Sequence, residues 1–472
     1  MLNINNEKNF ITGITYGNSK CIRTDYSYDS SFALNGKYLI PTASSSSNTQ
    51  IIQNTDGSIY FTYLKDNISG NPETALSKLT PSGIVDLSFG NNGETIIPYN
   101  SYDTQLKKHT DGKLFIVCLY DDGTAVAKIL PNGQLDPSFG TNGISTIPYI
   151  GSDSNTLGYG LYLQNNKPIV YGAAFNNFGS LLGYSLVYRL NENGTIDNTF
   201  GNNGAIQTAG ANVFLDNQSN IISLISGQSN PTGAIEKYNS NGQPFTSFGN
   251  NGVLAFPSSP GLINAAFMDS SNNIICSNID NEVFRINSNG VYDSSFIFDI
   301  NAFPFTSTEG ANLSLPITEK NGNYYISGIT GSMMEKFFIS KLTSTGNIDP
   351  VFNYYSETTN GLVFIGDMII NDTNIFAVRG NSIMKFLLNN SLATANTAKD
   401  TSAFSFENPV KKNLVYSSKE KVLKIEIYSV DGRLIKTIKE NNSTVSDLSK
   451  GVYVAKVSFE NGKIISRKLI KD

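Results

Sequence analysis

The sequence predicts an all-β protein: a β-propeller of eight four-stranded repeats, with seven blades as the alternative, followed by a small β-sandwich. Of the 472 residues, 58 are Asn and 41 are Gly, while only 15% are charged. This composition favours turns over helices. A short sequence motif, called here the repeat phrase, recurs about every 52 residues over roughly the first 390 residues. A different pattern of strands occupies the C-terminal residues. We therefore expect a propeller at 1–390, a linker at 391–405 and a C-terminal domain at 406–472.

A phrase marks each repeat: an Asp, two residues, a Phe and then Gly-x-x-Gly. Its clearest copies begin at Asp86, Asp136 and Asp197. We expect each Phe to wedge between neighbouring blades. We expect the glycines to supply left-handed backbone angles that β-branched residues reach only at a cost. The Phe positions of the copies are Phe32, Phe89, Phe139, Phe200, Phe248, Phe296 and Phe352.

Each repeat also carries one cation in an apolar segment before the phrase. The cations are Arg23, Lys78, Lys128, Arg189, Lys237, Arg285, Lys341 and Lys385. In five repeats the cation precedes the Asp by the same eight residues, as Lys78/Asp86, Lys128/Asp136, Arg189/Asp197, Arg285/Asp293 and Lys341/Asp349. This constant spacing predicts a fixed hairpin in which the two side chains approach each other. If both stayed solvated, such a pair would contribute only ~0–1 kcal/mol.

Residues 101–148 show the order of elements within one repeat. Apolar residues gather in four short stretches, and Asp-Gly or Asn-Gly turns punctuate them. Four short strands without a helix make one propeller blade. The expected strands are 102–108, 113–119, 125–130 and 143–148.

The last repeat is incomplete, because its three strands at 361–370, 374–379 and 382–388 have no clear fourth. We expect a strand from the other end of the chain to complete that blade. The first repeat begins within a strand at Leu2, so we place the closing strand upstream of Met1. The same upstream piece would hold the signal peptide that this sequence does not show. Eight repeats can be traced, so we expect eight blades, with seven as the alternative.

The repeat phrase resembles the delta-60 repeat family of bacterial propeller-like proteins. The second to fifth copies keep the Ser/Thr-Phe-Gly-x-x-Gly core, the first, sixth and seventh depart from it, and the eighth repeat lacks it. The resemblance covers about 390 residues. It implies a propeller and brings no catalytic residue with it.

The C-terminal residues form a different module of short antiparallel strands. The expected strands are 413–417, 422–428, 434–439, 452–459 and 464–470. Within 422–428 the residues Leu423, Ile425 and Ile427 alternate with polar ones, which predicts one buried and one exposed face. An Asp-Gly pair at 431–432 marks a hairpin turn. Strands and turns of this length within about 70 residues predict a small β-sandwich.

Several residues of this module form a recognisable pattern. They are Asn408, Pro409, Gly432, Gly451, Tyr453, Lys468 and Lys471. In these residues the module resembles the C-terminal sorting domain of the type IX secretion system of Bacteroidota. The resemblance implies export by the Sec route, translocation across the outer membrane, and release or surface attachment, with the type IX secretion machinery as the partner. The alternative is an ordinary accessory sandwich domain.

Charge and cysteine usage exclude several classes of protein. The net charge is −5, but residues 401–472 hold 14 basic and 8 acidic residues, so the remainder is acidic. An acidic body is a poor partner for nucleic acid. No stretch of 18 apolar residues predicts a membrane-spanning helix. Cys21, Cys118 and Cys276 are too scattered for a disulfide framework or a zinc site and are expected to be buried apolar side chains.

The sequence singles out no catalytic, cofactor-binding or metal-ligating residue. The one histidine, His109, lies in a turn without a nucleophile elbow. Neither a calcium loop nor a phosphate loop occurs. We therefore expect a secreted or cell-surface propeller that binds a glycan or a surface protein without catalysis. Two alternatives remain: an extracellular glycoside hydrolase or polysaccharide lyase with carboxylates in the propeller channel, and a mainly structural surface component.

Overall fold

The fold is all-β, as the composition predicted. The computed structural model describes residues 26–41, 49–67, 69–70, 72–99, 104–120, 123–147, 154–176, 181–210, 212–225, 233–256, 263–302, 311–330, 336–349, 352, 355–358, 365–388, 404–429, 433–460 and 464–472. In these residues every regular element is a strand, except for one short 3-10 turn at Ile300–Ala302. No helix in the described part is long and apolar enough to cross a membrane.

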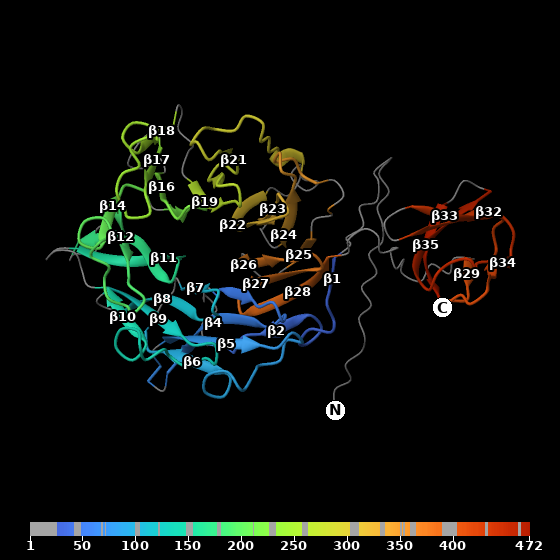
Figure 1. The fold of residues 1–472 in the computed structure, drawn as a ribbon, viewed down its shortest axis with the longest axis horizontal. Coiled ribbons are helices and arrows are strands. Elements are labelled where there is room, and N and C mark those ends of the chain that lie inside the picture. Colours follow the sequence, from blue (N-terminus) through green and yellow to red (C-terminus); the bar gives the residue numbers. More distant parts are fainter. Residues whose placement is uncertain are drawn as a thin grey trace. The chain divides into compact units, whose positions relative to one another are not determined.

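The described residues between 26 and 388 build the β-propeller from antiparallel sheets, most of whose strands follow one another by hairpins (Figure 1). The first sheet contains β3 (Ile51–Gln53), β4 (Ile59–Asp66), β5 (Pro72–Leu79) and β6 (Glu94–Ile97). The second contains β7 (Gln105–Lys108), β8 (Leu114–Tyr120), β9 (Gly123–Ile129) and β10 (Ile144–Ile147). The third contains β11 (Ser154–Gln164), β12 (Lys167–Asn176), β13 (Leu181–Arg189) and β14 (Ala205–Thr208).

The fourth and sixth propeller sheets repeat this order, whereas the fifth has three strands and the seventh has five. The fourth contains β15 (Asn212–Leu215), β16 (Ile221–Ile225), β17 (Ala234–Tyr238) and β18 (Val253–Ala255). The fifth contains β19 (Ile263–Met268), β20 (Ile274–Asn278) and β21 (Val283–Ile286). The sixth contains β22 (Ala311–Lys320), β23 (Asn323–Thr330), β24 (Lys336–Leu342) and β25 (Tyr355–Thr358). The seventh contains β26 (Ile365–Ile370), β27 (Asn374–Arg379) and β28 (Ser382–Leu388), joined by β1 (Tyr26–Tyr28) and β2 (Lys37–Leu39).

The described residues thus form seven propeller sheets, so the expected count of eight is wrong and the alternative of seven is correct. The first and last repeats share one sheet, because β1 and β2 both pair with β28. The cation of the last repeat, Lys385, lies 2.9 Å from Asp29 of the first phrase. The closing strands therefore come from residues 26–39 and not from upstream of Met1. Arg23, counted as a first cation, lies outside the described residues.

The recurrent Phe packs between neighbouring blades, as predicted, in the clusters that the structure describes. Phe139 is fully buried in a cluster that joins residues of the second sheet, such as Val126, to residues of the third, such as Leu186. Phe89 joins the first and second sheets in the same way, and Phe200 joins the third and fourth. Phe248 lies against the cluster that joins the fourth and fifth sheets. Phe296 lies in the cluster that joins the fifth and sixth sheets. Phe32 meets Phe376 edge to face at 5.5 Å, and Phe352 meets Tyr325 at 5.4 Å.

The C-terminal sheets form a separate domain with its own apolar core. Its main sheet is ordered β33 (Leu434–Ile438), β32 (Val422–Ser429), β35 (Gly451–Phe459) and β36 (Ile464–Lys471). Two short pairs accompany it: β29 (Phe404–Phe406) with β31 (Tyr416–Ser418), and β30 (Asn413–Leu414) with β34 (Ser443–Thr444). Since β29 begins at Phe404, it starts inside the predicted linker. The rest of that linker lies outside the described residues.

One detail of the predicted alternation in the C-terminal domain is wrong. Ile425 and Ile427 are buried, as expected, but Leu423 is 51% exposed. The pairing of β32 with β35 shifts register between Val422 and Lys424, so Val422 turns toward the core instead. A one-residue shift sends each side chain to the other face of a sheet.

Contact density groups the chain into two compact units. The first includes 38–369 and 377–383, and the second includes 25–37, 370–376 and 384–472. All the contacts discussed below lie within one unit or the other.

Candidate functional site

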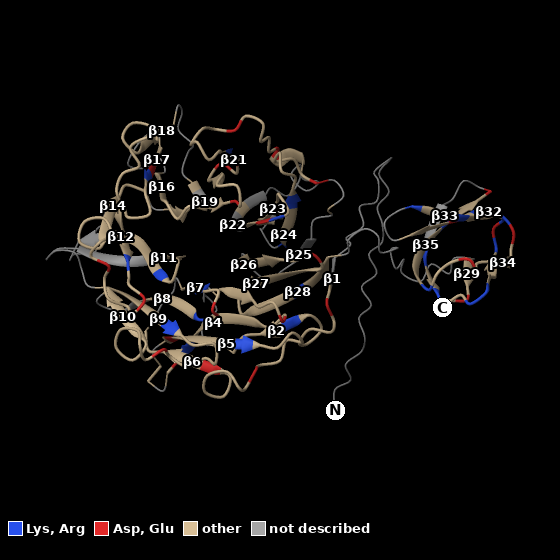
Figure 2. Ribbon diagram, in the orientation of Figure 1, with Lys and Arg blue, Asp and Glu red and all other residues tan. Residues whose placement is uncertain are grey.

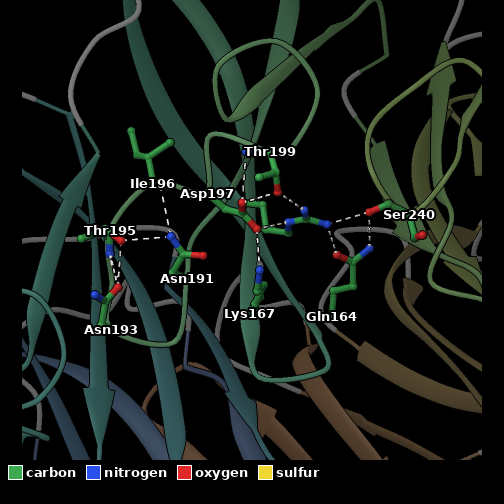
Figure 3. Close-up of polar contacts among 10 residues, drawn as sticks. Gln164, Lys167, Asn191, Asn193, Thr195, Ile196, Asp197, Thr199 and Ser240 are labelled. Carbon is green, nitrogen blue, oxygen red and sulfur yellow. Dashed lines mark hydrogen bonds and ion pairs between the residues drawn. The ribbon is translucent and has the colours of Figure 1, made fainter.

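In the third sheet the recurrent Asp and cation form a buried ion pair (Figure 3). Arg189 and Asp197 are 5% and 3% exposed. The Nε of Arg189 donates to Oδ2 of Asp197 at 2.8 Å, and Lys167 Nζ lies 2.6 Å from the same oxygen. The other oxygen accepts hydrogen bonds from the amide and hydroxyl of Thr199. Burial raises the pKa of Asp197, but these hydrogen bonds and the charge of Arg189 lower it more, so the carboxylate stays ionised.

The predicted approach of the two side chains is confirmed in the five repeats with the eight-residue spacing. The shortest N–O distances are 3.0 Å for Lys78–Asp86, 3.5 Å for Lys128–Asp136, 2.8 Å for Arg189–Asp197, 2.7 Å for Arg285–Asp293 and 2.7 Å for Lys341–Asp349. These pairs are not fully solvated, because each side chain is at most about a fifth exposed.

The cations also reach across to the following blade, which the sequence did not reveal. Arg189 donates to the carbonyl of Ser240 at 2.8 Å, and Arg285 to that of Ser344 at 2.6 Å. Lys128 donates to the carbonyl of Glu192 at 3.1 Å. Each acceptor lies three residues after the cation of the next repeat, but the distance in sequence from a cation to its own acceptor varies, because the loops between the two blades differ in length. The ion pairs therefore hold neighbouring blades together and are not candidate ligand sites.

One repeat has Phe245 where the others have Asp, and the structure shows how its cation is satisfied. Lys237 pairs with Asp216 at 3.1 Å instead. Its Nζ also lies 5.0 Å from the centre of the Phe245 ring. The charge of this partly buried lysine is compensated by a carboxylate that directly follows β15 in the same sheet.

Polar side chains on the first strands of several sheets form the candidate ligand site. Lys107 is on β7, Tyr162 on β11 and Asp367 on β26, and all three are half-buried. The amide of Ile51 donates to Oδ2 of Asp367 at 2.8 Å, and Lys107 Nζ lies 5.5 Å from the centre of the Tyr162 ring. Figure 1 places β7, β11 and β26 around the middle of the propeller. This group combines a cation, a carboxylate and an aromatic ring, which suits a polar ligand. No signal in the sequence pointed to this group, because its residues belong to no repeated phrase.

The carboxyl of Asp367, the acid of this group, has a raised pKa. Burial raises its pKa to about 6, although the amides of Ile51 and Met368 and the charge of Lys107 act in the opposite direction. Burial likewise lowers the pKa of Lys107, while the charge of Asp367 raises it. The pair can therefore offer both a hydrogen-bond donor and an acceptor at neutral pH.

We expect Asp367→Asn to change the pH dependence of stability in a defined direction. Folded Asp367 holds its proton up to about pH 6, whereas in the unfolded chain its pKa is about 3.9. This carboxyl therefore lowers the free energy of unfolding as the pH rises through that interval. The variant should gain stability over the wild type between about pH 4 and pH 7 in urea unfolding. If the free energy of unfolding of the variant differed from that of the wild type by the same amount at about pH 4 and at about pH 7, the raised pKa would be contradicted. The control is Asp66→Asn, at an exposed side chain.

The other residues considered for chemistry are placed as follows. Cys118 and Cys276 are buried free thiols, as predicted, and burial raises the pKa of Cys118 to about 12. Cys21 lies outside the described residues. His109 sits in a turn 2.9 Å from Asp111. The described residues hold no group of three or more His, Cys, Asp or Glu suited to a metal ion.

In the C-terminal domain the first and last motif residues meet at one edge of the main sheet. The Asn408 side chain donates to the carbonyl of Lys468 at 2.9 Å and accepts from the amide of Ile470 at 2.8 Å. Val410 then continues beside Lys471 as a parallel bridge. The Asn408 amide thus pairs with two backbone groups at the edge of β36.

The remaining motif residues of this domain lie on or beside β35. Gly451 is opposite Lys471 in the β35–β36 ladder, and the Tyr453 hydroxyl donates to the carbonyl of Ser449 at 2.9 Å. The peptide bond before Pro409 is cis. Gly432 lies outside the described residues. Lys and Arg occur on several strands and turns of the domain (Figure 2).

Comparisons with protein families agree with both parts of the chain. A model described as a secretion system C-terminal sorting domain matches residues 406–472. A model described as a domain of unknown function (DUF5122) beta-propeller matches residues 164–200, which include the pair Arg189–Asp197. The two matches confirm a propeller with a sorting tail of the type IX kind. No curated protein matches the chain.

Solved structures resemble the chain only distantly. PorZ, a surface component of the type-IX secretion system of Porphyromonas gingivalis, is 11% identical over 90% of this chain and 74% of its own, with a TM-score of 0.28. BamB from Moraxella catarrhalis is 10% identical over 75% and 97%, with a TM-score of 0.39. An acylaminoacyl peptidase of Pyrococcus horikoshii is 7% identical over 87% of this chain, which spans 57% of the peptidase, with a TM-score of 0.40. At these low scores the likenesses carry no argument about function.

Proposed function

We propose that this chain is an exported β-propeller that binds a glycan or a surface protein without converting it. The observation that carries the export is the sorting-domain match over residues 406–472. It implies handling by the type IX secretion machinery and delivery to the cell surface or the medium. The fold supports the binding of a ligand, because a propeller presents loops and first strands from many blades to one ligand.

The export is tested by deleting residues 405–472 in a bacterium with an active type IX system, with a cleavable Sec leader placed before Met1 in both forms. We expect the full chain in the medium or on the surface and the deleted form in the periplasm. Resistance of the periplasmic form to protease would show that its propeller is folded. Equal amounts of both forms outside the cell would exclude the sorting function.

The reverse experiment gives a matched control. Residues 391–472 fused behind a Sec leader and a fluorescent protein should bring that protein out of the cell. A tail that is only an accessory sandwich would leave the fusion in the periplasm, because such a domain carries no export information.

The binding proposal rests on the group formed by Lys107, Tyr162 and Asp367. A donor, an acceptor and an aromatic ring on neighbouring strands suit the hydroxyl groups and apolar faces of a sugar. A glycan array with the full chain should give signals that Lys107→Ala weakens at least tenfold, while Lys113→Ala in an exposed turn leaves them unchanged. A blank array, together with cell adhesion that falls when the gene is deleted, would favour a structural surface component instead.

The enzymatic alternative requires two carboxylates on either side of a scissile bond, about 5–10 Å apart. The charged neighbour of Asp367 is Lys107, a cation. This arrangement supports binding over hydrolysis. Release of reducing ends from polysaccharides, abolished by Asp367→Asn, would overturn the non-enzymatic proposal.

A further inference from the structure

The fifth propeller sheet differs from its neighbours because most of one edge of its third strand, β21, is uncovered in the described residues. β21 pairs with β20 on one side, and no described strand follows it on the other. Only the C-terminal end of that second edge is covered, where Ile286 bridges Tyr292 and the carbonyl of Arg285 accepts from the amide of Asp293 at 2.9 Å. In the fourth and sixth sheets that edge is covered by β18 and β25. A strand edge that lacks a partner presents unpaired N–H and C=O groups to an incoming chain.

The sequence after Phe296 differs from the motif that leads into the fourth strand of the second sheet. In the second sheet the turn into the fourth strand uses Gly140 and Gly143, whose φ angles are +53° and +90°. A Cβ at Gly140 would lie 2.0 Å from the carbonyl oxygen of Ile144. In the fifth sheet these two positions are Ile297 and Ile300, and a β-branched residue does not adopt such angles cheaply. The chain enters the 3-10 turn at Ile300–Ala302 instead.

A cavity lies beside β21, along the path that the chain takes in place of that strand. Its volume is about 590 Å³, which is within the range of ordinary ligand sites. Val283 and Phe284 of β21 line it, and Phe298 and Ile300 add further apolar surface. The hydroxyl of Tyr292, also in the lining, is buried without a hydrogen-bond partner in the described structure. A buried hydroxyl without a hydrogen-bond partner is unfavourable, so a ligand that supplied a partner would gain affinity.

The rim of this cavity is acidic. Asp280, Glu282 and Asp299 belong to its lining and are exposed, and the lining contains no Lys or Arg. One carboxylate oxygen of Glu282 accepts from Asn278 at 2.7 Å, and one of Asp299 accepts from the amide of Asn301 at 2.9 Å. The rim therefore complements a cationic partner.

We propose that this groove binds an extended segment of a partner polypeptide that carries Lys or Arg and pairs with β21 as the missing fourth strand. Pairing satisfies the open backbone edge of β21. Side chains alternate along an extended segment, so apolar residues enter the floor while the cations between them meet the acidic rim. This site is distinct from the group around Lys107, and the inference depends neither on export nor on glycan binding.

The test measures binding of synthetic peptides to the purified full chain by fluorescence anisotropy. The probe is an eight-residue labelled peptide of alternating Lys and Val. One control peptide has Glu in place of Lys, and another is N-methylated at alternate backbone amides. We expect saturable binding of the Lys-Val peptide and at least tenfold weaker binding of both controls. Hydrogen exchange of the β21 amides should slow when the Lys-Val peptide is added.

Charge reversal of the rim gives the matched variants. The double variant Glu282→Lys with Asp299→Lys should bind the Lys-Val peptide at least tenfold more weakly. The double variant Asp66→Lys with Glu192→Lys makes the same change in net charge elsewhere and should leave binding unchanged. Equal weakening by both, or equal binding of the Glu-Val peptide, would overturn the proposal. Binding that arises only after residues 303–310 are replaced by Gly and Ser would assign the groove to the chain itself and overturn it too.

Discussion

Arg189→Ala is expected to lower the free energy of unfolding of the propeller by about 3 kcal/mol. Removing one partner of a buried ion pair leaves the other charge buried, which typically costs about 3–5 kcal/mol. Asp197 keeps Lys167 at 2.6 Å, so we place the cost at the lower end of that range. The change also removes the hydrogen bonds to Gln164 and to the carbonyl of Ser240 in the next blade. Urea unfolding of the full chain, followed by tyrosine fluorescence, measures the difference.

Two further variants make this prediction specific. Arg189→Lys should recover part of the loss, because Lys128 occupies the corresponding place in the second sheet and pairs with Asp136 at 3.5 Å. Lys113→Ala breaks a pair whose side chains are 33% and 39% exposed, so it should cost less than about 1 kcal/mol. Similar losses for Lys113→Ala and Arg189→Ala would mean that the buried pair does not hold the blades together.

Phe139→Ala should destabilise the propeller by about 3–5 kcal/mol, the usual cost of emptying a buried aromatic site. Phe139 is fully buried and meets the Phe115 ring at 5.9 Å. Because its cluster draws residues from the second and third sheets, the cavity would open between blades. Thermal unfolding by calorimetry gives the loss.

The matched control for this change is Phe248→Ala. Phe248 holds the same place in the phrase but is only partly buried, so its loss should be clearly smaller. Leu87→Ala, at a side chain that is 70% exposed, should change stability by less than about 0.5 kcal/mol. If Phe248→Ala cost as much as Phe139→Ala, depth of burial would not explain the role of the recurrent Phe.

Much of the propeller could be predicted because its signals are local. The cation and the Asp are eight residues apart within one hairpin, so the spacing alone brings Lys78 and Asp86 together. The excess of Asn also has a local cause, since Asn92, Asn142 and Asn203 of the phrase have φ angles near +50°, which Asn tolerates better than most residues. The sorting motif was equally readable, although the contact between Asn408 and Lys468 was not.

The number of blades could not be decided in this way. The first phrase and the last cation were counted as two repeats, but Asp29 and Lys385 belong to one sheet. They are 356 residues apart, and no periodic pattern reports a contact at that separation. The candidate ligand site was hidden for the same reason, because Lys107 and Asp367 come from the second and seventh sheets.

By itself the sequence determined the all-β class, the internal plan of each blade and the sorting tail. Each of these depends on residues within a few positions of one another, where turn geometry fixes the distance. Only the tertiary structure decided how the propeller closes, which carbonyl each cation reaches in the next blade, and where polar groups gather on the first strands. It also showed that the fifth sheet has three strands in the described residues. These features depend on contacts between blades, and loops of unequal length separate those residues in the sequence.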